Sequence, residues 1–133
     1  MTAWADLRAK VGAALVTLGD DVSVHDGPVD SVTPPAFILV WPRPWGTPMS
    51  ACAYTARLQI ICVAARIDPT PGYEQLESLL DGILLSLRDK GFVVEPWDGP
   101  EPLDIGGLTY QTIRVTVSQP VTLSVTATVL PRR

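Results

Sequence analysis

The sequence contains a single histidine, His25, and this scarcity limits the catalytic chemistry open to it. A Ser-His-Asp or Cys-His site would have to use this one imidazole. Neither Cys52 nor Cys62 lies in a motif that suggests an activated thiol, and the phosphate-binding and dinucleotide-binding glycine motifs do not occur. His25 stands directly before Asp26-Gly27, so we interpret it as a turn residue rather than a general base or a metal ligand. The sequence therefore predicts a protein that is not an enzyme and that holds no metal or cofactor.

The two cysteines lie ten residues apart on what looks like one extended segment. At about 3.3 Å per residue their Cα atoms would be about 30 Å apart, which is too far for a disulfide. We expect two reduced thiols, with Cys62 as a small core residue. The first residues do not have the pattern of a secretory signal, and no apolar run approaches the roughly 20 residues that span a bilayer. These features predict a cytoplasmic protein without membrane contact.

Charged residues are also scarce, at 18% of the chain, and the net charge is −4. Nucleic-acid-binding proteins usually carry a basic stripe, whereas the lysines and arginines here are scattered, so specific DNA binding is not expected. Hydrophobic residues make up 47% of the 133 residues, enough for one domain that folds without disulfides. The low charged fraction hints that a partner covers some of the apolar surface.

Two amphipathic helices are predicted from apolar residues at helical spacing. The first runs from Trp4 to Leu18 and ends at Gly19. The second follows a proline-rich turn, ends at Gly91 and carries a stripe formed by Leu76, Leu79, Leu80, Ile83, Leu84 and Leu87.

Segments of high β propensity predict the strands, at residues 22–25, 36–41, 54–65, 92–97 and 110–119. We expect turns at Asp98-Gly99-Pro100 and Gly106-Gly107. This order of elements predicts an α+β fold, with a mostly antiparallel sheet and two helices packed on one face. We assign residues 1–120 to a single α+β domain.

A proline-stiffened loop over residues 42–48 is the first candidate contact surface, as part of a hairpin loop that projects from the domain. It contains Arg43, Pro44 and Trp45. Tryptophan is enriched at interface hot spots, and a stiff loop loses little entropy when it docks. Trp45 either makes such a contact or folds back onto its own sheet, while Trp41, inside an apolar strand, is expected in the core.

The C-terminal segment is the second candidate, because alternation resumes after Pro120, a residue that interrupts a ladder of hydrogen bonds. Residues 121–133 are either the last strand of the domain's own sheet or an arm that adds a strand to a neighbouring subunit. The apolar residues that would make the contact are Val121, Leu123, Val125 and Val129.

The order of elements resembles a known family. The pattern consists of the N-terminal helix, the Pro-Ala-Phe-Ile-Leu-Val-Trp-Pro strand at 35–42, the long strand from Tyr54, the Asp-Pro-Thr-Pro-Gly-Tyr entry at 68–73 into a leucine-rich helix, and the strand at 110–117. It is similar to the tail terminator and tail-completion proteins of long-tailed (siphovirus-type) bacteriophages, particularly those of actinobacterial hosts. The similarity covers nearly the whole chain and consists of patterns rather than signature motifs.

The resemblance implies a virion protein, assembled in the host cytoplasm, that forms a hexameric ring at the head-proximal end of the tail tube. Such a ring ends tube polymerisation and offers a docking surface to the head and neck connector proteins. Its partners would be further copies of itself, the tail-tube protein and the neck, and DNA would pass through the ring without specific binding. The family's hairpin loops and terminal arms make its contacts, and these match residues 42–53 and the segment after Pro120 here.

Other functions are compatible with the same sequence. A head-closure or neck protein and a tail-tube subunit are also small ring-forming α+β proteins. A more distant alternative is a monomeric cellular ligand-binding module with a pocket between sheet and helices. The last alternative is an enzyme centred on His25.

Overall fold

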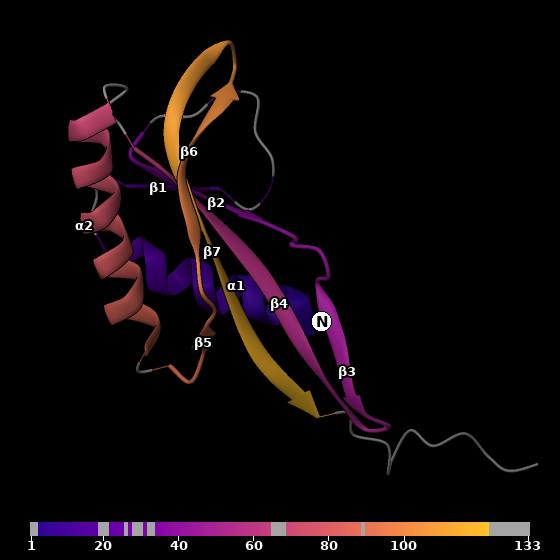
Figure 1. Cartoon of the computed structure of the whole chain (residues 1–133). Helices are drawn as coiled ribbons and strands as arrows, with labels where there is room; N and C mark the ends of the chain where they lie inside the picture. The colour runs from indigo at the N-terminus through magenta and orange to yellow at the C-terminus, as the bar shows by residue number, and fades with distance from the viewer. Residues whose placement is uncertain are drawn as a thin grey trace, which may run out of the picture.

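A computed structural model describes residues 3–18, 22–25, 27, 31, 34–64, 69–88 and 90–122. This part of the chain forms two α-helices and seven β-strands (Figure 1). In chain order they are α1 (Ala3–Val16), β1 (Ser23–His25), β2 (Ala36–Val40), β3 (Gly46–Ser50), β4 (Ala53–Val63), α2 (Pro69–Arg88), β5 (Val93–Val94), β6 (Asp98–Ile105) and β7 (Leu108–Thr122).

One sheet contains all seven strands, and β4 and β7 lie at its centre. The main order is β1-β2-β4-β7-β5, with β3 also paired to β4 and β6 to β7. β2 and β3 follow one another along the same edge of β4, and β7 pairs with the other edge along the whole of β4. Every pairing is antiparallel except that of β1 with β2. The predicted α+β fold with a mostly antiparallel sheet is confirmed.

Alternation along the two central strands directs one set of side chains toward both helices. The paired residues Leu58 and Val117, and Ile60 and Val115, are fully buried on this face. α1 and α2 pack against it with the buried residues Leu7, Val11, Leu15, Leu76, Ile83 and Leu87. The main core therefore lies between the sheet and the two helices, and at about 25 cal/mol per Å² its apolar area is the main source of stability.

The opposite face of the sheet carries a smaller apolar cluster. Ile38, Ile61 and Val63 lie there, covered by Ile105 and Tyr110 of the β6–β7 hairpin. The predicted Gly106-Gly107 turn joins these two strands, with φ angles of 60° and 85°. Positive φ at both central residues is the geometry of a two-residue hairpin turn that matches the twist of its strands.

Several predicted boundaries are wrong, and prolines explain most of the differences. The expected loop at 42–48 contains the start of β3, the expected turn at 98–100 begins β6, and β7 continues through Pro120 to Thr122. The strand expected at 92–97 shrinks to the two residues of β5.

Three strand prolines, Pro48, Pro102 and Pro120, have their nitrogen on the side away from the strand that they pair with. The carbonyl of Trp45 accepts a hydrogen bond from β4, so Pro48, three residues further along β3, is directed to the open edge. By the same alternation the nitrogen of Pro102 faces away from β7, and that of Pro120 faces away from β4, beyond the end of β5. A proline costs no ladder hydrogen bond at such positions.

Val121 pairs with Tyr54 of the same chain, and it packs against the main core. Leu123, Val125 and Val129 lie outside the described residues. Of the C-terminal segment, residues 121 and 122 thus belong to the domain's own sheet, and the inter-subunit arm stays a prediction for the rest.

Candidate assembly surface

Four aromatic side chains from three parts of the chain meet beside the β3–β4 hairpin. The ring of Trp4, in the first turn of α1, lies 4.7 Å from that of Trp45 and is stacked 5.1 Å from that of Tyr54. The ring of Trp41 lies 5.2 Å from that of Trp45. These centroid separations are those of favourable aromatic pairs, each contributing about 0.5–1.5 kcal/mol beyond area burial.

The backbone around Trp45 is held in place by two hydrogen bonds to its carbonyl oxygen. Trp4 donates from Nε1 over 2.8 Å, and the amide of Arg57 on β4 donates over 2.9 Å. Gly46 leaves room for the Trp4 indole, since a Cβ at this position would lie 2.8 Å from it. Trp45 therefore packs onto its own chain, yet its side chain remains 49% exposed.

Trp41 is not a core residue, contrary to expectation, because β2 ends at Val40 and the next residue leaves the ladder. Its side chain is 42% exposed, and the guanidinium of Arg8 lies 5.2 Å from the centre of its ring. A cation over an indole face is favourable by about 0.5–1 kcal/mol at an exposed site. Although Trp45 and Arg8 both contact the Trp41 ring, the ring remains accessible to solvent.

We define the hairpin patch as Trp41, Trp45 and Met49, whose side chains are 42–61% exposed. Beside it lies a shallow hollow of about 280 Å³, lined by Trp4, Trp45, Gly46, Thr47, Pro48 and Tyr54. Arg43 and Pro44, two of the predicted contact residues, are exposed directly before Trp45. These three predicted contact residues are consecutive and all exposed, and a fourth, Val121, lies at the end of β7, where it pairs with Tyr54.

An ion pair fixes the base of the hairpin patch. Arg57 donates from Nε and Nη2 to the two carboxylate oxygens of Glu95, over 2.9 and 2.7 Å, and from Nη1 to the carbonyl of Pro44. The hydrogen bonds and charge of Glu95 outweigh desolvation and raise the pKa of Arg57. The two side chains are only 18% and 27% exposed, so the charge-assisted bonds are partly shielded from solvent. Through Arg57, β4 is thus connected both to Glu95, which follows β5, and to Pro44, in the loop before β3.

A second apolar surface lies at the other edge of the sheet. We define the α2–β5 patch as Leu84, Leu85, Val94 and Trp97, of which Leu85 is 70% and Trp97 40% exposed. Within it a hollow of about 410 Å³ is lined by Leu84, Phe92, Val94 and Trp97. Sequence reasoning missed this surface, although the signal was present: Leu85 falls outside the apolar stripe of its helix.

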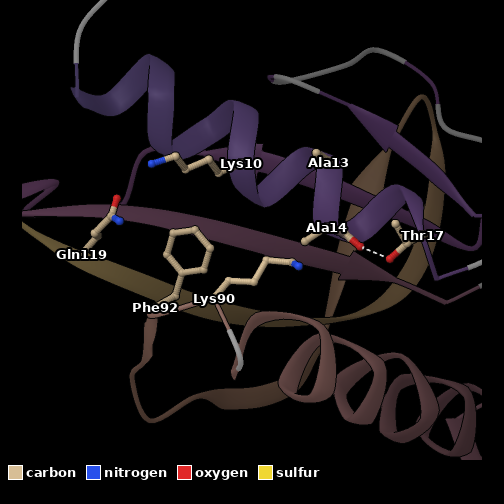
Figure 2. A pocket seen from close by; sticks show the side chains of 7 residues that line it. All are labelled: Lys10, Ala13, Ala14, Thr17, Lys90, Phe92 and Gln119. Atoms are coloured by element: carbon tan, nitrogen blue, oxygen red, sulfur yellow. Dashed lines mark hydrogen bonds between the residues drawn. The ribbon is translucent and has the colours of Figure 1, made fainter.

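A third hollow, of about 390 Å³, separates α1 from the chain that follows α2 (Figure 2). Figure 2 shows the Phe92 ring directed toward α1, with Lys10 and Lys90 contributed by the two sides. The ammonium group of Lys10 also lies 2.9 Å from the carboxylate of Asp6. This is the hollow that a ligand-binding module would use, as in the more distant alternative.

Within the described ranges, no cluster of three or more His, Cys, Asp or Glu side chains could hold a metal ion. His25 is the last residue of β1 rather than a turn residue, and its Nε2 is buried without a hydrogen-bond partner in the described part of the chain. Burial raises the pKa of the Cys62 thiol, which keeps it protonated and unreactive.

Neither a protein-family model nor a significantly similar curated protein matches the sequence. Among the described residues, no helix is long and apolar enough to cross a membrane. The grounds for a function are therefore the surfaces described above and the resemblance in the order of elements.

Proposed function

We propose that the chain is a structural subunit of a long-tailed bacteriophage virion that forms a ring at the head-proximal end of the tail tube. The ring ends polymerisation of the tube and presents a docking surface to the head and neck proteins. The observation that carries the proposal is the hairpin patch, in which two hydrogen bonds hold the backbone of Trp45 while the side chains remain about half exposed.

Rigid, exposed tryptophans are what a protein contact uses most effectively. An aromatic side chain that is already fixed loses little conformational entropy when it docks, so more of its burial energy contributes to affinity. Large apolar side chains exposed together on a small domain also favour association over a monomeric state. Both arguments favour a subunit of an assembly over the monomeric ligand-binding alternative.

The charge balance is compatible with a channel for DNA. The net charge of −4 would repel phosphates from the ring and let DNA slide without sticking. Specific DNA contacts are not part of the proposal, nor are a cofactor, a metal or a membrane.

Native mass spectrometry of the purified chain tests the proposal and separates its main alternatives. A terminator ring predicts one closed species at a fixed multiple of the 14.3 kDa subunit, unchanged as concentration rises. A tail-tube subunit predicts open-ended growth with concentration, and a ligand-binding module predicts a monomer. A head-closure or neck protein would also give a closed ring, and binding to isolated tail tubes rather than to portal complexes distinguishes the terminator.

The C-terminal arm has its own test, a chain ended after Thr122. This truncation keeps all the β7 pairing with β4 and removes Leu123, Val125 and Val129. If these residues contact a neighbour, the shortened chain keeps its helical circular dichroism signal and fails to form or stack rings. An unfolded product would show instead that the segment belongs to the domain's own core.

A further inference from the structure

The two exposed apolar surfaces lie at opposite edges of the sheet. β3, which carries Met49, pairs with β4 on the side of β2, whereas β5 pairs with the far side of β7. In Figure 1 the label for β3 and that for α2 accordingly stand on opposite sides of the molecule. A subunit with two different contact surfaces on opposite sides can bind its own copies head to tail.

The charges around the two surfaces have opposite signs. Residues 36–64, which include the hairpin patch, contain no acidic residue and two arginines, of which Arg57 is already paired with Glu95. Residues 69–104, which include the α2–β5 patch, contain eight acidic residues against one arginine and one lysine, and two of the eight, Glu95 and Glu101, are paired with arginines of the same chain. Arg8 and Arg43 border the hairpin patch, and the exposed Asp81 lies one helical turn before Leu85. Opposite potentials steer and orient an encounter between two protein surfaces.

The open strand edges of the hairpin are poorly suited to strand addition. Pro48 on β3 and Pro120 on β7 each place a nitrogen without a proton at the edge where a neighbour's strand would bind. Edge prolines of this kind prevent edge-to-edge pairing. Contacts of this region with another copy are therefore expected through side chains rather than through a shared sheet.

We propose that the hairpin patch of one copy docks on the α2–β5 patch of the next copy. In this contact an exposed hairpin side chain, foremost Trp45, enters the hollow of about 410 Å³ between α2 and β5. A tryptophan seated in a pocket with a polar rim is the usual composition of an interface hot spot. The inference rests on the proposed ring, because only a closing head-to-tail contact yields a ring of one kind of subunit.

The test uses two variants that each disrupt one surface and leave the other unchanged. Met49→Asp places a charge in the hairpin patch, and Leu85→Asp places one in the α2–β5 patch; both positions are more than 60% exposed, so the fold should tolerate the change. Leu108→Asp, at an exposed position outside both patches, is the matched control. Each variant is studied by circular dichroism and by sedimentation velocity, alone and in an equimolar mixture of the first two.

Each patch variant alone should be a monomer, with association weakened by roughly 30-fold or more, as for loss of a hot spot. The mixture should form a discrete 1:1 dimer and nothing larger, because only one intact pair of surfaces remains. The control should assemble like the parent. If Met49→Asp does not fold, Arg43→Glu, at an exposed loop position, replaces it.

Three results would overturn the inference. If Leu85→Asp forms the same rings as the parent, the contact lies elsewhere. The same follows if the parent forms rings but the mixture gives no 1:1 dimer. Either result leaves the proposed ring intact. A parent chain that stays monomeric would overturn the inference together with the proposed function.

Discussion

Trp4 lies so close to Gly46 that the effect of Gly46→Ala on stability should depend on whether Trp4 is present. A Cβ at position 46 would lie 2.8 Å from one ring carbon of Trp4 and 3.4 Å from another. The indole cannot shift freely, because its Nε1 donates to the carbonyl of Trp45. Gly46→Ala should therefore either distort this contact or break that hydrogen bond.

Two opposing terms decide the magnitude. Overpacking costs about 1–3 kcal/mol, whereas replacing glycine by alanine in a compatible strand contributes about 0.4–1 kcal/mol of stability through the unfolded state. In the parent, Gly46→Ala should thus lower the free energy of unfolding, by up to about 2.6 kcal/mol. In a Trp4→Ala background the clash is gone, and the same substitution should stabilise the chain by about 0.4–1 kcal/mol.

Urea unfolding of the parent, both single variants and the double variant measures this coupling, with circular dichroism to avoid relying on tryptophan fluorescence. We expect a coupling energy of about 1–3 kcal/mol, within the usual range for residues in contact. An equal effect of Gly46→Ala in both backgrounds would refute the packing of Trp4 over the hairpin, and with it the rigidity attributed to the hairpin patch.

Three further predictions concern the core, the ion pair and the histidine. Ile83→Ala should lower the free energy of unfolding by about 2–5 kcal/mol, and Glu77→Ala, exposed on the same helix, by less than about 0.5 kcal/mol; equal melting shifts would contradict the orientation of α2. Glu95→Gln should cost about 1 kcal/mol in urea unfolding, since Arg57 loses a partly buried charged partner; no change would mean that the bridge does not hold the loop. His25→Ala should sediment like the parent, because we assign the imidazole no role in assembly; a folded variant that no longer assembles would contradict this.

Local patterns were sufficient for the elements that face the core. The apolar spacing from Trp4 to Leu18 and from Leu76 to Leu87 predicted both helices, high β propensity predicted the strand from Tyr54, and alternation predicted the strand from Tyr110. These patterns succeed because a buried face imposes its period on the sequence. Leu80 shows the limit of the method: it belongs to the predicted stripe but is only half-buried, whereas Ile83 is fully buried.

The strands at the sheet edges could not be predicted in the same way. Prolines in β3 and β6 indicated loops, because a proline interrupts a ladder wherever its nitrogen faces a neighbour. Which way Pro48 and Pro102 face depends on the strand order, which no local pattern contains. Trp41 was misplaced for a related reason, since an apolar run does not reveal where pairing stops.

The candidate site was predicted in part. Proline stiffness and tryptophan drew attention to residues 43–45, and the structure leaves all three exposed, with the ring of Trp45 against those of Trp4 and Trp41. The partner surface on α2 and β5 depends on which side chains the fold leaves uncovered. That Leu85 is exposed can be recognised only once it is known which face of α2 packs against the sheet.

Negative-stain electron microscopy of the purified chain tests the central claim most directly. The account predicts class averages of one closed ring with a central hole, of constant subunit number at every concentration that gives assembly. Particles of single-subunit size alone, or filaments that lengthen with concentration, would contradict it.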